Sequence, residues 1–269
     1  MRKSYCAVRR YSHNIAGRDF VVGDVHGCFS QLDATLRALS YDVSRDRLFS
    51  IGDLVDRGPE SNSVLDAVRR HRIKAIRGNH EDMILRWYYG YGSSEQLDIN
   101  GGGWFIDLVN RGGLARPIAN FIRTLPYAIE IETTYGVVGL LHADAPCSPW
   151  NLLMATLERE RDEGMTKRKV LWQRSRWRSS KQSEVADWST TLGSLLGLPA
   201  PAPSSAAANP YQSIEGVDAV IVGHTPVLEP TVRGNVVNID TGAVYGGNLT
   251  VINLADVPRM IDKIATDVS

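Results

Sequence analysis

The sequence predicts an α/β fold in which two mixed β-sheets pack face to face, with helices on the outside. Three times in the first ninety residues, a short apolar strand ends in a polar turn containing glycine and leads into an amphipathic helix. From about residue 127 onward the pattern becomes strand-rich. Because the carboxyl ends of parallel strands meet at one edge of a sheet, we expect the polar turns to lie together along that edge.

One large domain accounts for the length of the chain. The 269 residues fit a single α/β domain, and a hydrophobic content of 43% is enough to fill a sizeable core. Residues 1–17 show no sustained period and are expected to be a lead-in segment, so that the domain covers 18–258. An inserted loop region is expected at about 175–215, because it includes a Pro/Ala/Ser-rich run at 199–210.

The charge and cysteine content exclude several classes of protein. Thirty basic residues balance thirty acidic ones, so the net charge favours neither nucleic acid nor a membrane surface as a partner. The short basic and aromatic stretch at 174–178 lacks a recognised nucleic-acid-binding module. Apolar runs are too short to span a membrane, and the N-terminus lacks the apolar segment of a secretion signal. Three cysteines without a CxxC pair fit a reducing compartment, so we expect a soluble, cytoplasmic protein without disulfides.

The three turns of the first half carry side chains that bind metal ions or anions. They read Gly-Asp-Val-His-Gly at 23–27, Gly-Asp-Leu-Val-Asp-Arg-Gly at 52–58 and Arg-Gly-Asn-His-Glu at 77–81. The strands expected before them cover 20–22, 47–51 and 73–76. A single Asp-x-His turn is more often a helix cap or a surface hydrogen bond. Three repeats of glycine with ligand-type side chains favour one shared site instead.

The second half adds two more turns that contain histidine. A hairpin of strands at 127–133 and 136–141 ends at His142, and a strand at 218–222 ends in Gly-His-Thr-Pro at 223–226. Further strands are expected at 235–239 and 249–253. The region between 83 and 123 should be helical, interrupted by a loop at the triple glycine 101–103. Five turns in all are therefore expected to bring polar side chains to the edge of the sheets.

The side chains at the turns suit a pair of metal ions. The candidate ligands are two aspartates, three histidines and an asparagine: Asp24, His26, Asp53, Asn79, His142 and His224. A single structural zinc does not need so many ligands and would normally include cysteine. Oxygen and nitrogen ligands suit manganese, iron or zinc, and more than four of them suggest two ions sharing a carboxylate. Two ions roughly 3.5–4 Å apart can clamp a phosphoryl group and acidify a bridging water, while arginines bind the phosphate oxygens.

The five motifs, in this order, resemble the signature of the metallophosphoesterases of the phosphoprotein phosphatase family. The segments at 101–104 and 240–244 are also similar to those of the bacterial and lambda-type serine/threonine phosphatases. The resemblance covers roughly residues 19–253. It implies the metallophosphoesterase-type sandwich of two mixed sheets, and hydrolysis of a phosphomonoester by direct attack of a metal-bridging hydroxide.

The resemblance also implies a role for each metal ligand. Asp24 and His26 would hold the first ion, and Asp53 would bridge the two ions. The ligands of the second ion would be Asn79, His142 and His224. Mn²⁺ is the expected metal at both positions, with iron or zinc as alternatives.

Five further residues are implied to take part in catalysis. His80 would be the general acid that protonates the leaving alkoxide, and Asp56 would orient it. Arg57 and Arg174 would bind the phosphate. Arg77 is a weaker candidate for that role, because a structural arginine beside Asn79 explains it equally well.

The resemblance leaves two enzyme functions and one non-catalytic function open. A serine/threonine protein phosphatase acting on phosphoproteins, with phosphotyrosine and small phosphomonoesters as weaker substrates, is the leading hypothesis. A symmetrical diadenosine tetraphosphate hydrolase shares nearly all the metal ligands, but those enzymes tend to lack the counterpart of Asp56 and to have Asp after the histidine of the third motif. A binding module with a decayed metal site is disfavoured because every expected ligand is present. The sequence does not indicate an oligomeric state, nor whether the inserted region is a surface loop or a specificity lid.

Overall fold

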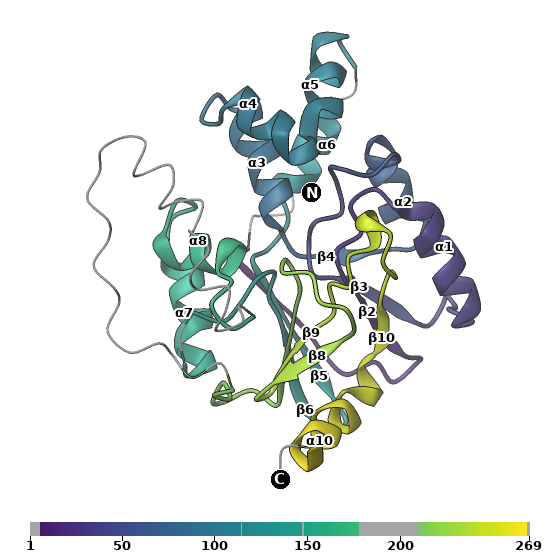
Figure 1. Cartoon of the computed structure of the whole chain (residues 1–269), viewed down its shortest axis with the longest axis vertical. Coiled ribbons are helices and arrows are strands. Elements are labelled where there is room, and N and C mark those ends of the chain that lie inside the picture. The colour runs from purple at the N-terminus through teal and green to yellow at the C-terminus, as the bar shows by residue number, and fades with distance from the viewer. Residues whose placement is uncertain (1–5, 114, 147, 178–208, 210, 268–269) are drawn as a thin grey trace.

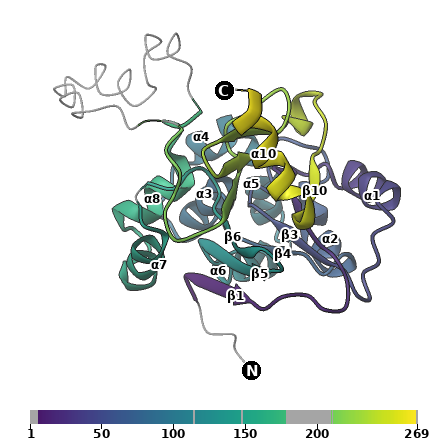
Figure 2. The same cartoon turned by 90° about the horizontal axis from the view of Figure 1, so that it is seen from below.

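The protein, seen in a computed structural model, consists of two β-sheets stacked face to face with helices around them (Figures 1 and 2). The structure describes residues 6–113, 115–146, 148–177, 209 and 211–267. Both sheets are mixed, as predicted. The inserted region expected at about 175–215 falls mainly on residues outside the described ranges.

The four-stranded sheet carries the three turns of the first half. Its strands are β2 (Asp19–Val22), β3 (Arg47–Ser50), β4 (Lys74–Ala75) and β10 (Val251–Asn253). They are arranged in the order β10-β2-β3-β4, and β2, β3 and β4 are parallel while β10 is antiparallel to β2. The carboxyl ends of β2, β3 and β4 therefore lie at the same edge of the sheet, as the repeated pattern predicted.

The six-stranded sheet carries the two turns that contain histidine. Its strands are β1 (Val8–Tyr11), β5 (Ala128–Thr133), β6 (Gly136–Leu140), β7 (Ala219–Val222), β8 (Thr231–Arg233) and β9 (Val236–Asn238). Their order is β1-β5-β6-β7-β9-β8. β5 and β6 form the predicted antiparallel hairpin, and β6 runs parallel to β7, so His142 and His224 follow neighbouring strand ends.

Helices cover the outer faces of both sheets. The α-helices are α1 (Phe29–Ala38), α2 (Val64–Arg70), α3 (Asn79–Tyr88), α4 (Ser94–Leu97), α5 (Gly103–Asn110), α6 (Ala115–Arg123), α7 (Trp150–Arg159), α8 (Met165–Trp172) and α10 (Val257–Asp267). The short helical turns are η1 (Ser61–Ser63), η2 (Asp98–Gly102), η4 (Ala243–Tyr245) and η5 (Leu254–Asp256). Figure 1 shows α1 and α2 on one side of the molecule and α7 and α8 on the other. No helix in the described part of the chain is long and apolar enough to cross a membrane.

Apolar side chains form three layers, one between the two sheets and one on the outer face of each sheet, because successive residues of a strand point to opposite faces. Val21 of β2 and Phe49 of β3 pack between the sheets with Ile129 and Ile221 of the six-stranded sheet. In contrast, Phe20 and its neighbours on the outer face pack beneath the helices of the first half. Strands buried on both faces read as continuous apolar runs, and they hold the turns at their ends on a rigid base.

The ordered fold begins earlier and ends later than the sequence suggested. Residues 8–11, which we expected to belong to a lead-in, form an edge strand parallel to β5, and Val8 is only 1% exposed. At the other end, α10 continues past residue 258. The edge strand was missed because its two central residues are Arg9 and Arg10. The Arg10 side chain turns outward and forms ion pairs with Glu130 and Glu158. The sequence of this strand therefore lacks the alternation of apolar and polar residues that predicts a strand.

Val8→Asp should therefore destabilise the protein. The substitution loses the ~1.5–3 kcal/mol gained by burying a valine and places a carboxylate in an apolar cluster, so we expect a loss of about 3 kcal/mol or more. Urea unfolding followed by circular dichroism measures it. Ile15→Asp is the matched control, because Ile15 is 92% exposed. Equal unfolding midpoints for the two variants would show that β1 contributes nothing to the folded core.

Candidate metal centre

The turns at the sheet edge are held in an uncommon backbone conformation. Seven non-glycine residues have positive φ in the described part of the chain, and five of them lie in the polar turns: His26, Asp53, Asp56, Arg57 and His224. Residues other than glycine adopt this region at a cost, so they persist only where the surrounding structure holds them, and they cluster at functional sites. The backbone conformation alone thus distinguishes these turns from ordinary surface loops.

Hydrogen bonds between the turns supply that restraint. The backbone N–H groups of Val25 and His26 both donate to the carbonyl of Asp53, at 3.0 and 2.8 Å. The backbone N–H of Gly223 likewise donates to the carbonyl of His142 at 2.8 Å. Each turn is therefore positioned by a neighbouring turn, and side chains from separate strands are brought into register.

Glu81 joins the second and third turns, a role that the sequence analysis did not assign. Its buried carboxylate accepts hydrogen bonds from the backbone N–H groups of Asp53, Leu54 and Gly78, each at 2.8 Å. Burial, together with the charge of Asp53, raises the pKa of Glu81 to about 7, although the N–H groups oppose the shift. The third motif contained Glu81, but nothing in its spacing indicated that it would bind the backbone of another turn.

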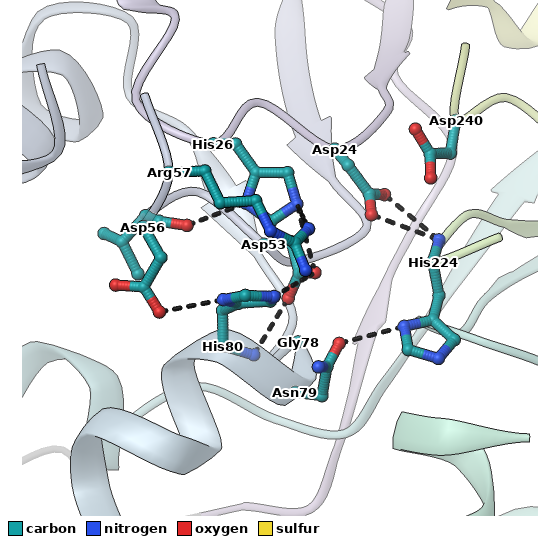
Figure 3. A network of polar contacts seen from close by, with 12 residues as sticks. Asp24, His26, Asp53, Asp56, Arg57, Gly78, Asn79, His80, His224 and Asp240 are labelled. Carbon is teal, nitrogen blue, oxygen red and sulfur yellow. Dashed lines mark hydrogen bonds and ion pairs between the residues drawn. The ribbon is translucent and has the colours of Figure 1, made fainter. Parts of the chain in front are cut away.

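The Asp53 carboxylate lies at the centre of the convergent side chains (Figure 3). Its Oδ2 lies 3.5 Å from His26 Nε2 and 3.9 Å from His80 Nε2, and its Oδ1 lies 3.4 Å from His142 Nε2. Asn79 Oδ1 is 2.8 Å from His142 Nε2 and 2.9 Å from His224 Nδ1. The structure therefore brings these six residues together from different strand ends.

Two groups of these residues have the spacing of a metal site. Ligand atoms of His26, Asp53 and His80 lie within 4.8 Å of one another, and so do those of Asp53, His142 and His224. Asp53 belongs to both groups. The Asp24 carboxylate, predicted to be a ligand of the first ion, accepts hydrogen bonds from the backbone N–H of His224 at 3.1 and 3.3 Å.

The histidines are oriented as metal ligands usually are. His26 Nδ1 lies 2.9 Å from the carbonyl of Val55, and His142 Nδ1 lies 2.8 Å from the carbonyl of Ile51. A neutral imidazole that donates from Nδ1 to a carbonyl presents the lone pair of Nε2 to the site. Within the described residues, the buried Nε2 of His224 has no hydrogen-bond partner, which is unusual for a buried polar atom. The donor set therefore fits two divalent ions.

Electrostatics at the centre also favour cations. Burial raises the pKa of Asp24 well above its ordinary value, and the nearby charges of Asp240 and Asp53 raise it further. Burial lowers the pKa of His26 to about 4, so its imidazole is neutral near pH 7. Metal ions bind deprotonated carboxylates and neutral imidazoles, and a cation relieves the repulsion between neighbouring carboxylates. Asp240, which lies beside Asp24 in Figure 3, was noted in the sequence only as part of the segment at 240–244.

His80 is paired with Asp56 next to the metal ligands. His80 Nδ1 lies 2.8 Å from Asp56 Oδ2, and the indole of Trp104 donates to Asp56 Oδ1 at 2.8 Å. Burial raises the pKa of Asp56 to about 7 and lowers the pKa of His80 to about 4. The buried His80 Nε2 faces the centre and has no hydrogen-bond partner among the described residues. This nitrogen is thus available to a ligand.

Two of the three candidate arginines lie at the site. Arg57 Nη1 is 2.7 Å from His26 Nε2, and its guanidinium lies 5.6 Å from the ring centroid of Tyr245. Burial lowers the pKa of the Arg174 guanidinium, while Asp24, Asp240 and Asp53 raise it, which places this arginine beside the acidic cluster.

Arg77 is placed elsewhere. Its guanidinium is 1% exposed and donates to the hydroxyl of Tyr127 at 2.9 Å, with Asp82 Oδ1 at 3.4 Å. These contacts favour the structural role, which the sequence analysis left open beside phosphate binding. Its position next to Gly78 in the third motif did not reveal which way the side chain turns.

Comparison with known families agrees with this geometry. The family model of the calcineurin-like phosphoesterases matches residues 20–228. The chain belongs to this family. It is therefore a metallophosphoesterase, a hydrolase of phosphoric esters that uses divalent metal ions.

Individual relatives of this phosphoesterase are named for different activities. Serine/threonine-protein phosphatase 1 of Salmonella typhimurium is 33% identical over 236 residues, which are 87% of this chain and 91% of that protein. A symmetrical bis(5'-nucleosyl)-tetraphosphatase of Nitrosospira multiformis is 27% identical over 267 residues, covering 88% and 92%. The crystal structure of a cold-active protein-tyrosine phosphatase from the psychrophile Shewanella sp. superposes with a TM-score of 0.54 at 16% identity, over 91% of this chain and 76% of that one. This last similarity shows the shared fold.

Asp53→Ala should lower the metal content of this phosphoesterase more than loss of one ordinary ligand, since Asp53 belongs to both ligand groups. After loading with Mn²⁺ and dialysis, elemental analysis should find less than one ion per chain in the variant. Asp66→Ala is a matched control, because Asp66 is exposed on α2 and forms an ion pair with the exposed Arg69. Undiminished metal in a folded Asp53→Ala protein would remove Asp53 from the centre of the site.

Proposed function

We propose that this phosphoesterase removes phosphate from phosphoserine and phosphothreonine in proteins. The observation that carries the proposal is the Asp56–His80 pair, complete at 2.8 Å and adjacent to Arg57. A paired histidine can protonate an alkoxide, which is the poor leaving group of a serine or threonine ester. The similarity to a serine/threonine phosphatase over nearly the whole chain supports the same substrate class.

The metal ligands are assigned from their positions at the strand ends. Asp24 and His26 would hold one ion, and Asp53 would contact both. The second ion would be held by Asn79, His142 and His224. When bound, the two ions would supply an acidified water as nucleophile and a clamp on the phosphoryl oxygens. We propose Mn²⁺ as the working metal, because carboxylate, amide and imidazole ligands without cysteine suit it.

The arginines would bind the phosphate. Arg57 extends from the second turn to His26, and Arg174, in the segment after α8, lies near enough to Asp24, Asp240 and Asp53 for their charges to raise its pKa against the effect of burial. Guanidinium groups can donate two parallel hydrogen bonds to a phosphate and offset the charge that develops in the transition state. Both arginines would hold the phosphate over the centre.

His80 would complete the reaction by donating a proton. Its Nδ1 is engaged by Asp56, so Nε2 is the atom that would carry the second proton of the imidazolium and give it to the leaving oxygen, which leaves a neutral ring. The Asp56 carboxylate would stabilise the protonated imidazole and fix its ring. The close spacing of His80, His26 and Asp53 also permits His80 to be a metal ligand, and the two roles predict different variants.

The substrate class is tested by comparing two substrates in metal-loaded protein. We expect a serine- or threonine-phosphorylated peptide to be turned over with a higher kcat/KM than diadenosine tetraphosphate. A chelator should abolish both reactions and added Mn²⁺ should restore them. The opposite preference would assign the chain to the symmetrical tetraphosphatases, in keeping with its relative from Nitrosospira multiformis.

The variant His80→Asn distinguishes the two roles of His80, as general acid or as metal ligand. Loss of a general acid typically costs ~10²–10⁴ in rate, while the ions and arginines still bind the phosphate. We expect kcat to fall far more than KM rises, with normal metal content by elemental analysis. The loss should be smaller with p-nitrophenyl phosphate than with phenyl phosphate, because p-nitrophenolate needs less protonation.

Two results would contradict this role for His80. Loss of metal from the variant would make His80 a ligand. Equal impairment on phenyl and p-nitrophenyl phosphates would show that it does not protonate the leaving group.

A further inference from the structure

Helix α5 contacts the Asp56–His80 pair on the side of Asp56 that faces away from His80. Asp56 uses both carboxylate oxygens: Oδ2 lies 2.8 Å from His80 Nδ1, and Oδ1 accepts from the indole Nε1–H of Trp104 at 2.8 Å. The carboxylate has a broad, roughly twofold torsional preference, so one hydrogen bond alone leaves its plane poorly fixed. A second donor on the opposite oxygen removes that freedom.

The segment before Trp104 also holds the backbone of the second turn. Asp56 and Arg57 are consecutive non-glycine residues with φ of 69° and 68°. The Arg57 backbone N–H donates to the carbonyl of Gly101 at 3.2 Å. Gly101 has φ of +88°, and a Cβ added there would lie 2.6 Å from Arg57 N, so glycine is required by both its conformation and its close approach. The end of η2 and the start of α5 thus contact the backbone of Arg57 and the side chain of Asp56.

We propose that Trp104 is a positioning residue for proton donation: its indole N–H fixes the Asp56 carboxylate and, through it, the ring of His80. This role rests on the proposed function of His80 as the general acid. It assigns a task in the reaction to the Gly-rich segment at 101–104, which lies outside the metal-binding turns. Proton transfer is sensitive to small errors of orientation, so a mobile carboxylate should lower the rate without weakening phosphate binding.

The packing of Trp104 makes a clean substitution possible. Its ring lies edge-to-face on the buried Phe105, with centroids 5.4 Å apart. Trp104→Phe keeps an aromatic ring at this position and removes the indole N–H. Trp87 is a matched control, since its ring also packs on Phe105 at 6.0 Å while its indole donates to the hydroxyl of Ser94 at 2.7 Å.

Kinetics with two leaving groups provide the first test. We expect Trp104→Phe to lower kcat on phenyl phosphate roughly tenfold, a part of the ~10²–10⁴ that a general acid contributes, with KM unchanged. The loss on p-nitrophenyl phosphate should be smaller, and Trp87→Phe should match the unaltered protein on both substrates. Equal losses on the two substrates, or no loss, would overturn the positioning role. Hydrolysis of neither substrate by the unaltered protein would instead contradict the proposed function.

Proton NMR of the metal-free protein tests the contact without relying on activity. The His80 Nδ1 proton should give a downfield imidazole resonance, identified by its absence in His80→Asn. Trp104→Phe should shift this resonance or broaden it by exchange with water, and Trp87→Phe should leave it in place. An unchanged resonance in Trp104→Phe would show that the indole does not position the pair, whatever the enzyme hydrolyses.

Discussion

The structure of the site depends on one buried carboxylate, that of Asp53. It lies within 3.4–3.9 Å of imidazole nitrogens from three other turns, and its Oδ1 accepts the backbone N–H of His80 at 3.0 Å. Burial alone would raise the pKa of Asp53, yet the interactions with His142, including a side-chain hydrogen bond, and with the neighbouring His80 and His26 lower it well below its ordinary value. The carboxylate is therefore ionised, and its negative charge among imidazole nitrogens suits a divalent cation.

Such a concentration of charge and backbone strain needs a rigid support. Strands buried on both faces provide this support, because the apolar side chains on either side fix the position of the strand end from which each turn begins. Glu81 then ties the second turn to the third through three backbone hydrogen bonds, and Gly58 allows close contact with the first, where an added Cβ would lie 1.9 Å from the carbonyl of His26. The polar turns are thus one unit, with Trp104 and α5 closing its outer side.

The features predicted from the sequence are those that follow from local pattern and strand direction. Apolar runs at 20–22 and 47–51 indicated buried parallel strands, and parallel strands place their turns at one edge. That rule was sufficient to predict that the polar turns lie together. It contains no information on which way a side chain turns, and Arg77, adjacent to the third turn, in fact packs against Tyr127.

The features that were missed arise from contacts between distant segments. Trp104 reaches Asp56 across 48 positions of the chain, and no periodicity in either segment indicates that hydrogen bond. Strand β1 was missed because its pairing with β5 is made by the backbone, while its arginines resemble those of a solvated lead-in. The local sequence predicts a strand well only where burial of the strand produces a recognisable pattern of apolar residues.

We propose that Asp53 holds two metal ions close together. Electron paramagnetic resonance of protein titrated with Mn²⁺ tests this claim directly, because ions that share a carboxylate at roughly 3.5–4 Å interact magnetically. We expect two ions per chain at saturation and a spectrum of coupled Mn²⁺ that Asp53→Ala abolishes. Saturation at one ion, or two ions with the spectrum of isolated Mn²⁺, would contradict the account.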